Sequence, residues 1–283
     1  MTEPDFEQRR EVQRQRWERA AQGWGRRADH LAEQTRPLAQ WLVEQLELEP
    51  GERVLELAAG PGDTGFMAAR AVAPGTLVSS DASEAMIELA RARARGLGIE
   101  NVEFAQLALE WIDLPAASVD ALLCRWGLML CADPAAAATE MRRVLKPGGR
   151  LAVAVWDTAE RNPWATVDDR ALMELGHMEA PEAGGPGMFA LAPEEKLREL
   201  LEGAGFIEVI VDGIELDRTF ASVEDYVAET LDFSVAFAEV WERLDEQERA
   251  VALERIAELA APYREADGSL RLPGRSLAAA ASA

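Results

Sequence analysis

The segment from Glu56 to Gly65 contains the residues of this sequence whose types and spacing best suit ligand chemistry. Its small residues allow backbone amides to approach a ligand closely where a strand gives way to a helix. Gly60, Gly62 and Gly65 have the GxGxxG spacing of nicotinamide-binding folds. Asp81 follows ~20 residues later, the distance of an acid that binds ribose hydroxyls. The loop predicts a site for an adenosine-bearing cofactor, and it does not choose between a nicotinamide dinucleotide and another adenosyl compound.

Short apolar runs alternate with helical patterns after residue 48, and these elements must position the loop. The first run, Arg53 to Leu57, is of buried-strand type and ends at the loop. Strand and helix in alternation predict a doubly wound, Rossmann-like α/β sheet. The other predicted strands are Thr76 to Asp81, Val102 to Ala105, Val119 to Arg125, Arg150 to Trp156 and Ile207 to Val211, and the helices are Thr64 to Ala73, Ser83 to Arg95, Pro134 to Val144 and Pro193 to Glu202.

Two regions break the alternation. Residues 162–191 include the Gly- and Pro-rich stretch Met178 to Gly187, which predicts a mobile connection, and Ser222 to Tyr263 predicts two helices. Together they predict a lid, followed by a last strand that completes a seven-stranded sheet. The predicted divisions are an N-terminal helical cap at 1–48, a cofactor-binding core at 49–220, a helical lid inserted at 221–264 and a C-terminal segment at 265–283.

Four pieces of the sequence carry a family resemblance that extends well beyond the loop. They are Val54 to Asp63, Ser80 to Met86, Asp113 to Asp120 and Arg142 to Leu151, the last with Leu-Lys-Pro-Gly-Gly before a predicted strand. Over roughly residues 15–215 the chain resembles the class I S-adenosylmethionine-dependent methyltransferases. It is most similar to the ubiquinone/menaquinone C-methyltransferase-like (methyltransferase type 11) branch. The resemblance implies S-adenosylmethionine as cofactor and methyl transfer as the reaction.

The resemblance also implies how the cofactor is held. Glu56 would accept hydrogen bonds from the cofactor's amino group, while the loop amides and the next helix terminus receive its carboxylate. Asp81 would take both ribose hydroxyls. Adenine would lie between an apolar shelf and Glu110. The cofactor-binding candidates are Glu56, Ala58, Gly60, Gly62, Asp81, Ala82, Met86, Leu109, Glu110 and Arg125.

Two positions depart from the family pattern. The family usually has an acid near the position of Ala108, where it binds adenine's amino group, and a glycine where Ala58 stands. Glu110 is one replacement for the missing acid. The alternatives are that backbone groups and packing hold the adenine, or that cofactor affinity has declined.

The acceptor is predicted to be a small, largely apolar molecule. The chain has 29 Lys and Arg against 51 Asp and Glu, and the net charge of −22 repels polyanions. The motif of enzymes that methylate flipped bases is absent after Arg125, so nucleic acid is not expected as a partner. Arg125 and Asp157, at the ends of predicted strands, could orient a polar group of the acceptor. The candidate substrate-pocket residues are Trp126, Trp156, Asn162 and Phe189.

No residue is assigned as catalytic. Methyl transfer from an activated sulfonium can be accelerated mainly by positioning and water exclusion. If the acceptor must lose a proton, His177 in the predicted mobile connection is the candidate base, ahead of His30. No metal is expected, because Cys124 and Cys131 belong to no CxxC or Cys/His cluster.

Two alternatives remain from other functional classes. An NAD(P)-dependent oxidoreductase would fit the glycine loop, but the helical preface, the Leu145 to Gly149 piece and the lack of a Ser/Tyr/Lys set argue against it. A non-catalytic S-adenosylmethionine-binding protein is suggested only by Ala108.

The cellular setting follows from two absences. The first residues lack the apolar core of a signal peptide, and no run reaches the ~18 apolar residues of a membrane span. These features predict a cytoplasmic protein with no membrane partner, in a reducing compartment. The sequence leaves monomer and homodimer equally open.

Overall fold

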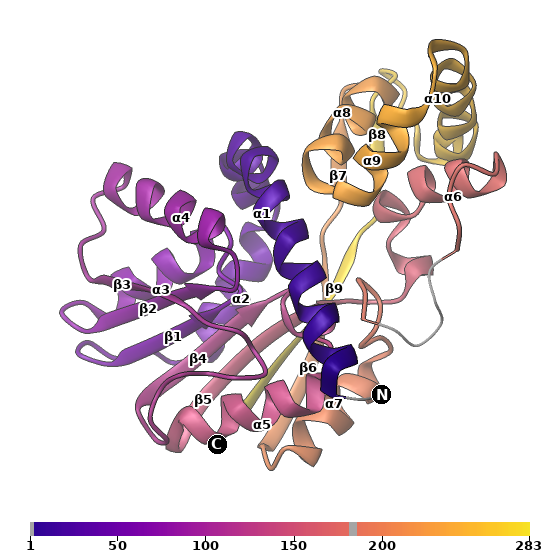
Figure 1. Ribbon diagram of the computed structural model, residues 1–283. Helices are drawn as coiled ribbons and strands as arrows, with labels where there is room; N and C mark the ends of the chain where they lie inside the picture. The colour runs from indigo at the N-terminus through magenta and orange to yellow at the C-terminus, as the bar shows by residue number, and fades with distance from the viewer. Residues whose placement is uncertain (1–2, 181–185) are drawn as a thin grey trace.

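A seven-stranded mixed sheet forms the centre of the larger part of the molecule. It is seen in a computed structural model that describes residues 3–180 and 186–283 (Figure 1). The strand order is β3-β2-β1-β4-β5-β9-β6, with β1 to β5 parallel and β9 antiparallel to both of its neighbours. The strands are β1 (Arg53–Leu57), β2 (Thr76–Asp81), β3 (Val102–Gln106), β4 (Val119–Arg125), β5 (Leu145–Trp156), β6 (Ile207–Glu215) and β9 (Arg275–Ser282).

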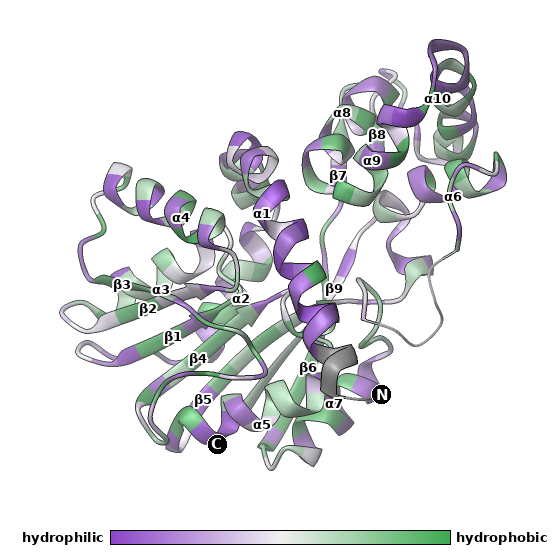
Figure 2. Cartoon of the chain, in the orientation of Figure 1, coloured by the Kyte–Doolittle hydropathy of each residue, from purple (hydrophilic) through white to green (hydrophobic). Residues whose placement is uncertain are grey.

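Apolar side chains explain why these segments become internal strands. Val54, Leu55 and Leu57 of β1 are fully buried, as expected for a parallel strand covered on both faces. In Figure 2 the strands of this sheet are mainly in the hydrophobic colour. The helices packed around the sheet are α2 (Arg36–Gln45), α3 (Asp63–Val72), α4 (Glu84–Gly96), α5 (Pro134–Val144) and α7 (Glu194–Gly203). The predicted doubly wound α/β fold is confirmed.

The predicted element boundaries agree closely, with two exceptions. β5 begins at Leu145 rather than Arg150, because Leu145 pairs with Val119 and an irregularity in β4 accommodates the Pro- and Gly-containing stretch. The amide of Gly148 is also satisfied, since it donates to the carbonyl of Ala283. β6 continues to Glu215 because β9 pairs along its whole length. Both strands are therefore longer than the sequence around them predicts, because each pairs with a strand that is distant in the sequence.

The last strand completes the sheet as expected. β9 lies between β5 and β6, and its residues Ala278 to Ala281 are buried. Small side chains suit a central strand that has helices against it, including α2 and α7. The Ala-rich end of the sequence is thus a core strand rather than a tail.

A second, smaller body contains a two-stranded sheet and several helices. Its strands are β7 (Arg218–Phe220) and β8 (Leu270–Leu272), and its helices are α6 (Val167–Glu174), α8 (Val223–Phe233), α9 (Val235–Arg243) and α10 (Glu246–Ala260). It has its own hydrophobic core, which includes Tyr226, Phe237 and Ile256. We call this body the lid; it lies at the upper right of Figure 1.

The prediction of two helices from Ser222 to Tyr263 is wrong, because the segment forms three. Ser234 ends α8 and its hydroxyl caps α9 by accepting from the amide of Phe237. Asp245 then starts α10 with a capping box. These two capping residues divide a stretch whose helical spacing of apolar residues otherwise looks continuous. The predicted mobile connection from Met178 to Gly187 falls partly on residues 181–185, which lie outside the described residues.

A long first helix connects the two bodies. α1 (Glu3–Gln34) runs between the sheet and the lid and packs on both α4 and α8 (Figure 1). Much of it carries the hydrophilic colour in Figure 2. Short 3-10 helices complete the chain at Leu128–Leu130, Ala159–Arg161, Pro163–Ala165 and Ala261–Tyr263. None of the helices described is both long and apolar enough to cross a membrane.

Candidate active site

A cavity of about 1070 Å³ opens at the carboxyl ends of the parallel strands and continues to the lid. This is the edge where open α/β sheets bind ligands. α1 and the lid supply the remaining walls. The predicted site residues that line it are Ala58, Gly60, Asp81, Ala82, Met86, Leu109, Glu110, Arg125, Trp126, Trp156 and Phe189.

The loop after β1 takes a backbone conformation that ordinary residues avoid. Ala58, Gly60 and Gly62 have φ of 51°, 52° and 86°. The loop after β4 comes so near that a Cβ on Gly127 would lie 2.5 Å from that of Ala58, so only glycine fits there. An alanine with positive φ costs of order 1 kcal/mol, and such strain gathers at ligand sites.

Asp81 connects this loop to the next strand. Its Oδ2 accepts from the amide of Gly60 at 3.0 Å, and its Oδ1 accepts from the amide of Ser83 at 2.9 Å. Burial raises the pKa of Asp81, and these backbone hydrogen bonds oppose that rise. The carboxylate lines the cavity with lone pairs still free, which suits the binding of a ligand's hydroxyls.

Glu56 lies behind the loop and is not part of the cavity wall. Its Oε1 accepts from the amide of Gly65 at 2.8 Å and its Oε2 from the Ser79 hydroxyl at 3.1 Å. A Cβ on Gly65 would lie 2.0 Å from this carboxylate, which explains the glycine. Burial, together with the charge of Asp63, raises the pKa of Glu56 to about 8. Its direct contact with the cofactor stays a prediction.

The far side of this end of the cavity has the apolar shelf that the sequence predicted. The shelf consists of Ala82, between β2 and α4, and Met86 in the first turn of α4, while Leu109 comes from the loop after β3. Glu110 also lines the cavity, with its Oε1 accepting from the amide of Ala132 at 3.0 Å. Ala108 stands beside it in the wall. Glu110 is thus held near the position where the family acid is missing.

Arg125 joins three parts of the chain at the end of β4. Its guanidinium donates to the Thr35 hydroxyl and to Asp63 Oδ2, both at 2.7 Å. It also lies over the Trp126 ring, 4.8 Å from the centroid. Because these contacts engage both terminal nitrogens, Arg125 fastens the α1–α2 junction to the start of α3 while one edge faces the cavity.

An aromatic wall connects the strand ends to the lid. Trp126 and Trp156 stack with centroids 4.3 Å apart, and Trp156 meets Trp164 at 4.9 Å. Phe189 lines the cavity as predicted, whereas Phe237 is buried in the lid core. This wall is apolar and rigid, and it leads from the loops toward the lid.

Besides Glu56, four predicted residues lie outside the cavity wall: Gly62, Asn162, His177 and Asp157, whose carboxylate pairs with Arg275. The Asn162 amide donates to the carbonyls of Asp157, Thr158 and Arg275, so it holds a strand end instead of facing a substrate. Gly62 lies under the loop, next to Phe66. His177 is half-buried beyond α6. The assignment of Asn162 to the substrate pocket is therefore wrong, because its own chain takes up its hydrogen-bonding groups.

α1 covers the cavity and is fastened at two places. The Glu18 carboxylate accepts from the amides of Glu84 and Ala85, which caps α4. Trp17 and Trp24 line the cavity and meet edge to face at 5.4 Å. The predicted cap helix thus forms part of the cavity wall.

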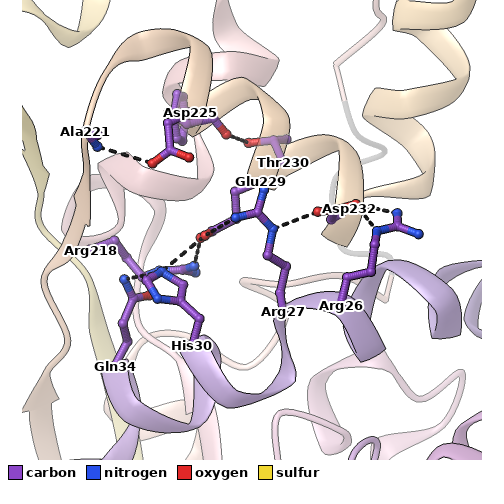
Figure 3. Close-up of polar contacts among 11 residues, drawn as sticks. Arg26, Arg27, His30, Gln34, Arg218, Ala221, Asp225, Glu229, Thr230 and Asp232 are labelled. Atoms are coloured by element: carbon purple, nitrogen blue, oxygen red, sulfur yellow. Dashed lines mark hydrogen bonds and ion pairs between the residues drawn. The ribbon is translucent and has the colours of Figure 1, made fainter.

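The second fastening of α1 is a set of ion pairs with the lid. Figure 3 shows Arg26 and Arg27 directed at Asp232 of α8, and Arg27 Nε lies 2.7 Å from Asp232 Oδ2. His30 Nε2 lies 3.4 Å from Glu229 Oε2. His30 is exposed and belongs to this contact rather than to the cavity wall.

Sequence reasoning missed the charged groups at the lid end of the cavity. They are Asp168, Asp169, Arg218 and Glu229, with the polar but uncharged Tyr226 beside them. Asp168, Arg218 and Glu229 are almost completely buried. In the sequence they look like ordinary surface charges, and only their burial together marks them. Within residues 3–180 and 186–283, no group of three or more His, Cys, Asp or Glu side chains could hold a metal ion.

Comparisons with known proteins agree with this geometry. A family model described as a methyltransferase domain matches residues 48–205. The ubiquinone/menaquinone biosynthesis C-methyltransferase of Cronobacter sakazakii is 32% identical over 170 residues, or 56% of this chain and 68% of that protein. The enzyme of the same name from Shewanella frigidimarina is 29% identical over 187 residues, or 61% of this chain and 74% of that protein.

A solved structure shares the fold. A putative methyltransferase from Bacillus halodurans matches with a TM-score of 0.59 and 21% identity, over 86% of this chain and 97% of that one. At this identity the likeness concerns the fold alone.

Proposed function

This chain belongs to the class I S-adenosylmethionine-dependent methyltransferases, in the ubiquinone/menaquinone C-methyltransferase-like branch, and from that premise we propose that it methylates a small, largely apolar molecule. The cofactor is S-adenosylmethionine. The observation that carries the proposal is a continuous cavity, which runs from the loop after β1 along an aromatic wall to the lid.

The residues at the loop end fit S-adenosylmethionine. Asp81 presents a carboxylate with free lone pairs for ribose hydroxyls, and Ala82 with Met86 offers an apolar surface for adenine. Glu110 is held where it can accept from an exocyclic amine. Glu56, which is hydrogen-bonded behind the loop, is the proposed partner of the cofactor's amino group. When bound, the cofactor supplies a methyl group already activated on a sulfonium.

An apolar acceptor is favoured by the wall that faces it. Trp126, Trp156 and Phe189 offer aromatic surface, and burial of apolar area is worth ~25 cal/mol per Å². The volume of about 1070 Å³ is at the upper end of ligand pockets, so it has room for a cofactor and one small molecule. The net charge of −22 argues against nucleic acid as the acceptor.

The chain's contribution to the reaction is positioning and the exclusion of water. The aromatic wall positions the acceptor, while α1 and the lid cover part of the cavity and reduce its exposure to water. His177 lies outside the wall, so the proposed reaction does not use it as a base.

Turnover with methyl-labelled S-adenosylmethionine and a panel of small aromatic and aliphatic molecules tests the proposal. We expect S-adenosylhomocysteine to form with several panel members, to vanish in Asp81→Ala, and to persist in the surface control Glu254→Gln on α10. Methylation only of added RNA or DNA would contradict the proposed acceptor class. Binding without turnover of any small molecule would favour the non-catalytic alternative.

A further inference from the structure

The lid end of the cavity contains a buried cation that the proposed function leaves unused. Arg218 of β7 is only 3% exposed and lines the cavity. Its guanidinium lies 4.8 Å from the Trp164 ring centroid and 5.7 Å from those of Phe220 and Phe233. Three aromatic rings therefore hold this charge in place, away from water.

Arg218 is fixed from one side only. A terminal nitrogen donates to Glu229 of α8, and Glu229 is in turn approached by Arg27 and His30 of α1 (Figure 3). The Nε atom of Arg218 is buried and has no hydrogen-bond partner within the part of the chain that the structure describes. A buried donor without a partner is costly, so a ligand group at this atom would stabilise the site.

A second buried polar atom without a partner lines the same cavity. Asp168, in the first turn of α6, is 4% exposed, and its Oδ1 accepts no hydrogen bond from the described residues. Tyr226 lies against both groups: its hydroxyl donates to the carbonyl of Trp164, and its charge interactions reach Arg218 as well as Asp168. Arg218 and Asp168 therefore belong to the same end of the cavity wall, with Tyr226 interacting with both residues.

Neighbouring charges restrict what can bind there. Asp169 follows Asp168 and also lines the cavity, and Glu229 adds a third carboxyl. Burial and the charge of Asp168 raise the pKa of Asp169 to about 7. A carboxylate ligand would place another negative charge among these acids. An ammonium ligand has no acceptor for the Arg218 Nε–H.

We propose that the lid end of the cavity is a subsite for a hydroxyl group of the methyl acceptor, which donates to Asp168 Oδ1 and accepts from Arg218 Nε. A hydroxyl has one proton and two lone pairs, so it satisfies both atoms at once. The inference rests on the proposed function, because it places the acceptor in the cavity shared with S-adenosylmethionine. The acceptor class is thereby narrowed to alcohols with an apolar body.

Fluorine NMR of Trp164, which reports binding of small probe molecules, tests the subsite without a known acceptor. The full chain is labelled with 5-fluorotryptophan, saturated with S-adenosylhomocysteine and titrated with benzyl alcohol, toluene, benzylamine or benzoate while fluorine NMR follows Trp164, assigned with Trp164→Phe. We expect benzyl alcohol to shift this resonance and to bind about fivefold or more tightly than toluene, since each hydrogen bond contributes modestly.

Matched variants show whether the two named atoms cause the preference. Asp168→Asn keeps the shape, and Arg218→Lys keeps a charge for Glu229 without the Nε–H. Both should reduce the preference for the alcohol over toluene to less than about twofold, while Glu254→Gln leaves it unchanged. Circular dichroism confirms that each variant is folded.

Several results would overturn the subsite. These are equal binding of toluene, tighter binding of benzylamine or benzoate, an unaltered preference in folded Asp168→Asn and Arg218→Lys, or no shift with any probe. S-adenosylhomocysteine binding is measured in the same samples. Its loss would remove the proposed function and the subsite together, whereas its presence without an alcohol preference would remove the subsite alone.

Discussion

The two ends of the cavity differ in how the charged side chains that we propose for ligand binding are satisfied. At the loop end, Asp81 and Glu56 accept hydrogen bonds from backbone amides at Gly60, Ser83 and Gly65. At the lid end, Asp168 and Arg218 each retain a buried atom without a partner. The loop end is built by local backbone geometry, while the lid end depends on side chains from β7, α6 and α8 brought together by folding. A fixed cofactor suits the first arrangement, and a variable acceptor suits the second.

The largest effect is expected at the loop end, from Asp81→Ala. The substitution removes two charge-assisted hydrogen bonds to ribose hydroxyls, so affinity for S-adenosylhomocysteine should fall about 100-fold or more. Asp81→Asn, which keeps the shape, should cost about tenfold. Calorimetric titration measures both. An affinity that is unchanged in Asp81→Ala would show that the loop end is not the cofactor site.

Glu56 should make the folded protein less stable as pH rises. Its folded pKa of about 8 lies above the ordinary value of 4.5, so the folded state retains a proton that the unfolded state releases between these values. Over that window one such proton lowers the unfolding free energy by about 1.4 kcal/mol per pH unit. Urea denaturation between pH 5.5 and 7 measures this slope, and Glu56→Gln should make the slope shallower by that amount. A slope that is the same in Glu56→Gln as in the wild type would assign it to other buried acids.

Asp168→Asn should stabilise the protein although it weakens the proposed alcohol subsite. Burial raises the pKa of Asp168 above its ordinary 3.8, which means that the folded state disfavours the carboxylate, whereas an amide carries no such penalty. Removing that charge should raise the thermal midpoint by roughly 2 °C, for about 1 kcal/mol. Differential scanning calorimetry compares it with Glu254→Gln. A lower thermal midpoint in Asp168→Asn would mean that the Asp168 carboxylate has a structural partner. The two ends of the cavity would then not differ in the way described above.

The smallest effect is expected from Ala58→Gly. Glycine accepts the φ of 51° without strain but adds freedom to the unfolded chain, so the net change in unfolding free energy should stay within about 1 kcal/mol. Cofactor affinity should be retained, because the backbone amides keep their place. Destabilisation of several kcal/mol would show that the Ala58 methyl group packs in a required contact.

The loop end was largely predictable because its signals are local. Positive φ values require small residues, so Gly60 and Gly62 are visible in the sequence. Strands β2 and β4 matched their predicted bounds for the same reason, since each is a short buried run between turn residues. Asp81 ends β2, and its position is fixed by that strand.

The lid end was not predictable, because it depends on contacts between distant segments. Asp168 and Arg218 are 50 residues apart, and each stands among other charges in the sequence. Nothing local distinguishes them from Asp217 or Arg271, which face solvent as an ion pair. For Asn162 the sequence instead predicted a site residue that does not line the cavity. Its place after β5 suggested the pocket, but its side-chain amide is hydrogen-bonded to the backbone of Arg275.

Calorimetric titration of the wild-type chain shows whether the loop end of the cavity binds S-adenosylmethionine. Separate titrations use S-adenosylmethionine, S-adenosylhomocysteine and NADH. We expect micromolar binding of both adenosyl ligands with one site per chain and no heat from NADH. Binding of NADH with silence from both adenosyl ligands would contradict this expectation.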